Sequence, residues 1–259
     1  MILVLGAVVR ILKTFTAALC LTAAFPAAAT VIHVGGPGTG IGYDPFGSYG
    51  GIRYVRPDSS VFDIIGPAGQ FQFRGINTST NAAYLAYTFC VDLFKDAGDG
   101  DYLISSLSSI TANVTKQQQL AALVTHADAI INAAGISGRG DATASFQLAI
   151  WEVLYETGIS GYDVSVGNFS TYGDSSTNNY FVPLWGQANG YLANVTNGTW
   201  TASANRASIL FSETAQSQIV PNAIPEPSSW LMMILGFAGI GAASRRKAKA
   251  IATALSSNG

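Results

Sequence analysis

Two apolar segments flanked by basic residues, one at each end of the 259-residue chain, most constrain what this chain can fold into. In the first, residues 1–29, Arg10 and Lys13 precede the core of an apolar run at 15–25, and small residues follow at 27–29. This order is typical of a secretory signal peptide and predicts its removal after export. The part of the chain between the two segments is then left to form a folded domain outside the cytoplasm.

The second apolar segment belongs to a tail with three parts in order. Pro225, Glu226 and Pro227 come first, an apolar stretch follows from 228 to 244, and a basic cluster begins with Arg245 and Arg246. At about 1.5 Å per helical residue the stretch is barely long enough to cross a bilayer. We therefore expect a transmembrane helix whose basic end stays in the cytoplasm.

This tail resembles the PEP-CTERM sorting signal of Gram-negative bacteria, which consists of Pro-Glu-Pro, a transmembrane segment and arginines. The resemblance implies processing by an exosortase after transient anchoring in the inner membrane by the C-terminal helix. It also implies final localisation at the cell surface or in the medium, often in species that make exopolysaccharide. A plain C-terminal anchor is the alternative interpretation.

The charge of the remaining chain limits its partners. Between the two terminal segments, seven Lys and Arg stand against fourteen Asp and Glu. An acidic surface repels phosphate backbones and anionic lipid headgroups, so we expect no nucleic-acid partner. The Asp-rich turn at 95–102 lacks the spacing of a calcium loop, and a solvated turn is the favoured interpretation. We predict no cofactor and no metal.

The pattern of apolar residues predicts an α+β, mainly β fold. Short strand-like runs occur at 52–55, 60–65, 70–76 and 82–94, and the segments 181–188, 197–204 and 208–212 return to short strands and polar loops. Two amphipathic helices are expected between these groups of strands. Thr115 is the predicted cap of the first helix, Asp141 or Thr143 the predicted cap of the second, and Gly158 its stop.

We therefore expect a β-rich domain with a small helical insert, plus an N-terminal signal helix and a C-terminal transmembrane helix. The predicted segments are a signal peptide (1–29), a Gly-rich N-terminal segment of loop or irregular edge structure (30–51), a β-rich domain (52–213) with the helical insert at about 115–158, a linker (214–224), the sorting signal (225–249) and a tail (250–259).

One cysteine remains once Cys20 leaves with the signal peptide. Cys90 follows Phe89 in the sequence TFCVDL, within the apolar run at 82–94. A second unusual residue is Gln147, which lies among apolar residues of the second predicted helix. A glutamine there costs free energy unless its amide is hydrogen-bonded. The ordinary interpretation is a glutamine bonded at the edge of the core.

Taken together, TFCVDL and FQLAIW resemble the two motifs of the thioester domains in bacterial surface adhesins. Cys90 matches the family cysteine, and Gln147, Ala149, Ile150 and Trp151 match the second motif. The resemblance implies a β-sandwich or barrel with a helical subdomain, and a thioester between the Cys90 sulfur and the Gln147 side chain. Apolar neighbours would protect that bond from water. The predicted environment of the thioester is Phe89, Phe146, Ala149, Ile150 and Trp151.

Three functions follow from these patterns. The first is a secreted surface protein that attaches once, covalently, to an amine-bearing protein or matrix target; it is not an enzyme and has no catalytic residue. The second is a non-reactive structural or exopolysaccharide-binding matrix protein that uses exposed aromatic residues: Tyr155, Tyr162, Tyr172 and Tyr180. The third is a cysteine hydrolase that pairs Cys90 with His126.

Overall fold

The computed structural model describes residues 30–43, 48–172 and 181–222. The predicted signal peptide, the sorting signal with its Pro-Glu-Pro and Arg245–Arg246, and the tail lie outside the described residues. Within the described part of the chain, no helix is long and apolar enough to cross a membrane.

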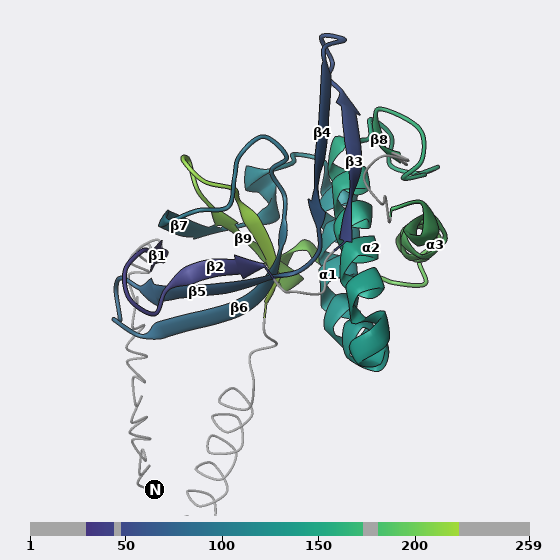
Figure 1. Ribbon diagram of the computed structural model, residues 1–259. Coiled ribbons are helices and arrows are strands. Elements are labelled where there is room, and N and C mark those ends of the chain that lie inside the picture. The colour runs from purple at the N-terminus through teal and green to yellow at the C-terminus, as the bar shows by residue number, and fades with distance from the viewer. Residues whose placement is uncertain (1–29, 44–47, 173–180, 223–259) are drawn as a thin grey trace, which may run out of the picture.

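An antiparallel barrel forms one half of the domain (Figure 1). Its strands pair in the order β1 (Val31–Val34), β7 (Gly100–Ser105), β9 (Ala207–Phe211), β10 (Gln218–Pro221), β6 (Ala83–Cys90) and β5 (Phe71–Asn77). The barrel closes because β1 also pairs with β5, through Ile32 opposite Asn77. A further strand, β2 (Gly40–Tyr43), pairs with the other end of β5. Closure leaves few unpaired strand edges.

Alternating side chains fill the barrel interior. Ile32, Val34, Phe73 and Tyr102 are each 0% exposed, and the rings of Phe73 and Tyr102 meet edge to face at 4.9 Å. Gly75 lies where β5 meets β1, and a Cβ there would lie 2.4 Å from Ile32. A glycine is therefore required for the close approach of the two strands.

A second, three-stranded sheet carries the order β4 (Val61–Ala68), β3 (Ser48–Val55), β8 (Phe169–Tyr172). The β3–β4 hairpin extends away from the barrel alongside α2 (Figure 1). Ile52 of β3 lies opposite Ile64 of β4. Ile52 is buried in the main core cluster, so the hairpin packs by this face.

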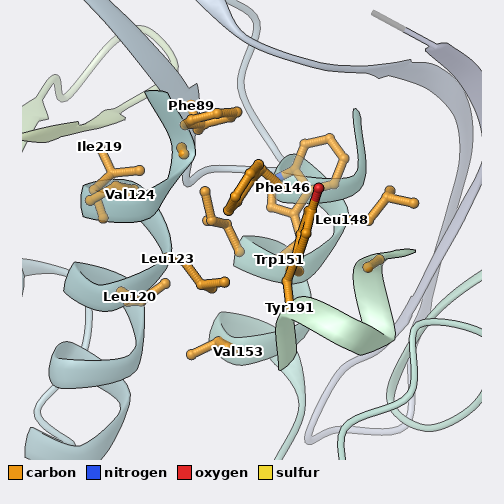
Figure 2. Packing of buried hydrophobic residues seen from close by; sticks show 14 of the residues in the cluster. Phe89, Leu120, Leu123, Val124, Phe146, Leu148, Trp151, Val153, Tyr191 and Ile219 are labelled. Atoms are coloured by element: carbon orange, nitrogen blue, oxygen red, sulfur yellow. The ribbon is translucent and has the colours of Figure 1, made fainter. Parts of the chain in front are cut away.

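Three α-helices complete the domain: α1 (Val114–Ala133), α2 (Gly135–Tyr155) and α3 (Trp185–Thr196). Short 3₁₀ helices precede or follow them: η1 (Leu107–Ser109), η2 (Val182–Leu184) and η3 (Ala204–Arg206). Gly135, with φ of 65°, reverses the chain between α1 and α2, which lie side by side (Figure 1). Buried faces of α1 and α2 share the main core with Phe89 and Ile219 from the barrel strands (Figure 2).

The structure confirms a barrel-like, mainly β domain with a few helices. The prediction of loop or irregular structure for the Gly-rich segment 30–51 is wrong, since it forms β1, β2 and the start of β3. Main-chain pairing with β5 and β7 needs no particular side chain, and the glycines between β1 and β2 adopt positive φ to make the turn.

Three local predictions are corrected. Residues 181–188 form η2 and the start of α3 instead of a strand, because the aromatic and apolar residues there serve a helix face equally well. The cap of α1 is Asn113, whose side chain accepts from the N–H groups of Thr115 and Lys116. The second helix begins at Gly135, before the predicted cap Asp141.

Candidate functional site

Cys90 is the last residue of β6 and lies opposite Gln218 of β10. The next residue, Val91, donates its N–H to the Ser217 carbonyl at 3.0 Å, on the β10 side. Hydrogen-bonding directions alternate along an antiparallel strand, so the N–H and C=O of Cys90 point the other way, toward the β5 side. Strand β5 begins at Phe71, opposite Thr88, and leaves those two groups of Cys90 without a strand partner.

Gln147 of α2 supplies the missing partner. Its Oε1 accepts from the Cys90 N–H at 2.8 Å, and its Nε2 donates to the Cys90 carbonyl at 2.8 Å. Both residues are buried, with Gln147 0% and Cys90 1% exposed. The carboxamide therefore replaces a neighbouring strand at the end of β6, which satisfies its own polar atoms and lies directly against Cys90.

The thiol of Cys90 donates to the main-chain oxygen of Asp92 at 3.0 Å. Burial raises the pKa of this thiol far above its ordinary value, and the nearby Asp92 carboxylate adds to the effect. The Asp92 main chain and the indole N–H of Trp151 act in the opposite direction, because they favour the ionised sulfur. Burial dominates, so the free thiol is neutral at physiological pH.

An apolar shell surrounds the Cys90–Gln147 pair. The Phe89 and Phe146 rings are 6.2 Å apart, and Phe146 stacks on Tyr191 of α3 at 4.2 Å (Figure 2). Ala149 and Ile150 are 0% exposed and Trp151 is 3% exposed. The structure places all five residues of the predicted environment in the main core with Cys90. Sequence reasoning missed Tyr191, which lies in a helix that was not predicted.

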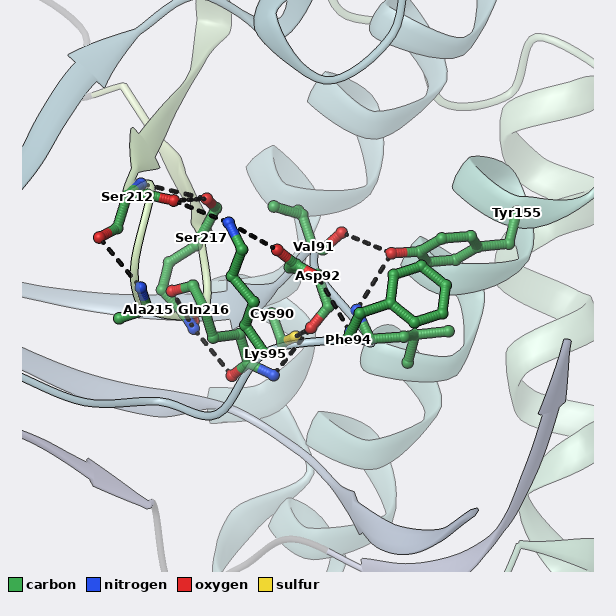
Figure 3. Close-up of polar contacts among 12 residues, drawn as sticks. Cys90, Val91, Asp92, Phe94, Lys95, Tyr155, Ser212, Ala215, Gln216 and Ser217 are labelled. Carbon is green, nitrogen blue, oxygen red and sulfur yellow. Dashed lines mark hydrogen bonds and ion pairs between the residues drawn. The ribbon is translucent and has the colours of Figure 1, made fainter. Parts of the chain in front are cut away.

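A cavity of about 180 Å³ reaches Cys90 and Trp151 from between the β3–β4 hairpin and the loop after β6. Its polar lining includes Lys95 and Gln216, which the sequence did not single out. The Gln216 amide donates to the Asp92 carbonyl at 2.9 Å, and the Lys95 ammonium to the Ser212 carbonyl at 3.1 Å (Figure 3). These contacts fix the loop that carries Asp92. The Cys90 side chain thus lines a cavity although the residue is only 1% exposed.

Tyr155 fixes the other end of the same loop. Its hydroxyl donates to the Val91 carbonyl and accepts from the Leu93 N–H, each at 3.1 Å (Figure 3). Burial raises the pKa of this phenol above its ordinary value. Tyr155 is therefore a structural residue beside the site, and not an exposed stacking platform for sugars.

The other tyrosines predicted to stack on sugars do not form an exposed row either. Tyr162 is buried and donates to Gln119 at 2.9 Å. Tyr172 bonds to Asp63 through its hydroxyl. Tyr180 lies outside the described residues. Of the predicted stacking residues that the structure describes, Tyr155 and Tyr162 use their hydroxyls in internal hydrogen bonds, whereas Tyr172 is half-buried.

His126 is not brought to the thiol by any hydrogen bond or ion pair that the structure contains. Its Nδ1 lies 2.8 Å from the Ala122 carbonyl of the same helix, and its ring stacks on Trp200 at 4.8 Å.

The Asp-rich turn makes ordinary turn and ion-pair contacts, including Asp92 with Lys95 at 3.4 Å. Among the described residues no cluster of three or more His, Cys, Asp and Glu could hold a metal.

This arrangement has the parts needed for acyl transfer between side chains. The Cys90 N–H bonded to Oε1 polarises the Gln147 carbonyl, as an oxyanion-hole donor does. The sulfur belongs to the same residue as that donor, so nucleophile and polarising group move together. The apolar shell restricts water around the pair.

Comparison with known proteins identifies one segment. Residues 223–247 match the family model of the PEP-CTERM protein-sorting motif. No match was found among curated proteins or solved structures. The motif implies export, passage through the membrane before processing, and an exosortase as the processing partner.

Proposed function

The chain carries an exosortase-sorting motif and is therefore an exported surface protein. We propose that Cys90 and Gln147 of this protein form an internal thioester. The thioester serves for single-use covalent attachment to an amine-bearing protein or matrix target. Because each molecule reacts once, the protein is an adhesin or matrix component and not an enzyme.

The observation that supports this proposal most strongly is the contact between the Gln147 side chain and the main chain of Cys90. The Gln147 carboxamide is held at two points, 2.8 Å each, on the main chain of Cys90. A glutamine elsewhere in the core could form its amide hydrogen bonds with any strand edge. Gln147 forms them with Cys90, the free cysteine of the described residues. Close approach of nucleophile and acyl carbon supplies much of the rate in such reactions.

The reaction balances without a co-reactant. The Cys90 sulfur attacks Cδ of Gln147, an S–C bond forms, and the C–N bond breaks. The thiol proton leaves with the nitrogen as ammonia. When an amine later enters through the cavity, its nitrogen attacks the same carbon, a C–N bond forms, the C–S bond to Cys90 breaks, and a proton from the amine restores the Cys90 thiol. The target is then joined to residue 147 by an amide bond.

The intact mass of the mature protein, purified from the producing cells, tests the proposal. We expect a mass lower by one ammonia than the sequence gives, and a gain of one methylamine after treatment with that amine. Cys90→Ala and Gln147→Ala should abolish both changes. Gln119→Ala is the matched control, because Gln119 is also a buried glutamine with both amide ends bonded, but to Ile159 and Tyr162. An unmodified mass with a freely titratable thiol contradicts the proposal.

A non-reactive structural or exopolysaccharide-binding matrix protein is the second candidate. One observation favours it: the Gln147 amide is fully satisfied on the main chain, and the thiol is already bonded to Asp92. Such a glutamine serves stability alone. On this alternative the methylamine experiment gives no mass change, and Gln147→Ala destabilises the domain because it leaves two buried main-chain groups unpaired.

A further inference from the structure

The indole N–H of Trp151 is a buried donor that forms no hydrogen bond with the described residues. Trp151 is 3% exposed and lines the cavity that also contains Cys90. A buried N–H without an acceptor costs free energy comparable to a lost hydrogen bond. Unpaired groups of this kind are rare, and one that lines a reactive cavity points to an acceptor that is present only in another chemical state.

The position of Trp151 follows from the helix. It lies four residues after Gln147 on α2, so both side chains occupy the same face. That face is turned toward the end of β6, where the Gln147 amide bonds to Cys90. The indole therefore lies beside the sulfur, and its N–H favours the ionised form of the thiol.

The neutral thiol does not need this donor, because its own proton is bonded to the Asp92 carbonyl. Once the proton is lost, the nearby Asp92 carboxylate disfavours the negatively charged sulfur, whereas the Asp92 main chain favours it. A side-chain N–H donor would stabilise that charge as well. The free N–H of Trp151 is such a donor in the same cavity.

We propose that Trp151 is a catalytic residue whose indole N–H binds the Cys90 sulfur whenever that sulfur carries negative charge. This inference rests on the thioester proposed above. It gives Trp151 two tasks: to stabilise the attacking sulfur when the thioester forms, and the departing sulfur when an amine opens it. In both steps the proton moves between sulfur and nitrogen, and the indole keeps its own hydrogen.

The test compares the mature wild-type protein with Trp151→Phe, which keeps an aromatic ring and removes the N–H. We expect thioester formation and methylamine incorporation, followed by intact mass, to be about a hundred- to a thousand-fold slower in the variant, the usual loss for one such donor. After methylamine opening, the rate of alkylation of Cys90 across a pH series should give a higher apparent pKa in the variant. A purely structural role would leave that pKa unchanged.

Trp185→Phe is the matched control, because its N–H bonds to Thr171 at 2.7 Å, away from Cys90. It should keep the wild-type rate and thiol pKa. If Trp151→Phe does not fold, benzothienylalanine at position 151 preserves the bicyclic shape and lacks only the N–H. A wild-type rate and thiol pKa in either variant overturns the role of Trp151 and leaves the thioester standing. A wild-type protein without the ammonia deficit contradicts the thioester itself, and the thiol titration then still reports whether the indole N–H reaches the sulfur.

Discussion

At the scale of single residues, Glu152 has the most unfavourable environment next to the site. Its side chain is 0% exposed, and Oε1 accepts from the Asp163 N–H at 2.9 Å while Oε2 has no partner in the described residues. The pKa of this carboxyl is raised to about 8, chiefly by burial and also by the charges of Glu156 and Asp163, against the Asp163 N–H hydrogen bond and the charge of Lys116. Glu152 is therefore protonated in the folded protein near neutral pH.

This raised pKa predicts that stability falls as the pH rises from about 4.5 to about 8. The folded-state pKa of about 8 exceeds the ordinary value of 4.5, so the stabilising effect is complete below about pH 4.5 and is lost as the pH rises through 8. The free energy of unfolding, measured by urea denaturation from about pH 5 to 9, should fall by a few kcal/mol in the wild type. In Glu152→Gln, which imitates the protonated acid, this fall should be much smaller. An equal fall in both proteins would show that Glu152 ionises freely.

The sequence pattern predicted which residues of α2 lie at the site, but it did not predict which residues from other parts of the chain contact them. The spacing of Gln147, Ile150 and Trp151 on one helical face is visible in the sequence, and the structure places them in the core with Cys90. Lys95 and Gln216 were not predicted, because they reach the cavity through a loop and a turn whose paths depend on the whole barrel. Local periodicity carries no signal for such residues.

At the scale of secondary-structure elements, α1 depends on a cap, Asn113, that lies two residues before the predicted cap Thr115. The side chain of Asn113 accepts from the N–H of Thr115 at 3.0 Å and of Lys116 at 3.2 Å. Both residues fit a cap by type, since Asn and Thr are each common there. The choice between them depends on where the chain leaves the preceding 3₁₀ turn, which tertiary packing sets.

The two residues give a matched pair of variants. Asn113→Ala should lower the free energy of unfolding by about 1 kcal/mol, because two N–H groups at the start of α1 lose their acceptor. Thr115→Ala should change it by less than about 0.5 kcal/mol, since its side chain is exposed and is not the cap. Thermal or urea unfolding measures both. The reverse order would restore Thr115 as the cap.

At the scale of the whole molecule, Cys90 and Gln147 lie where the barrel meets the helices. Cys90 ends a barrel strand and Gln147 belongs to α2, so a covalent bond between them would tie the two halves together across a 57-residue separation. A cross-link of this length restricts the unfolded chain much as a disulfide does, worth about 4 kcal/mol on the chain-entropy estimate.

Opening the bond should therefore weaken the fold. We expect methylamine treatment of the mature protein to lower the free energy of unfolding by up to about 4 kcal/mol, because the unfolded chain regains its freedom. Gln147→Ala, which cannot form the bond, should be insensitive to methylamine. A wild-type protein that incorporates methylamine without losing stability would indicate a bond that acts in attachment alone.

By itself, the sequence determined the features that depend on local order: the C-terminal sorting motif, the alternation that makes strands, and the two long helices. The sorting motif at 223–247 is recognisable because its recognition depends on a linear arrangement of residues. Tertiary structure alone decided that the glycine-rich segment would pair as β1 and β2, that 181–188 would join a helix, and that Gln147 would occupy the empty edge beside Cys90. Those outcomes depend on hydrogen bonds between main-chain groups that are far apart in the sequence. These groups come together only once the barrel has closed.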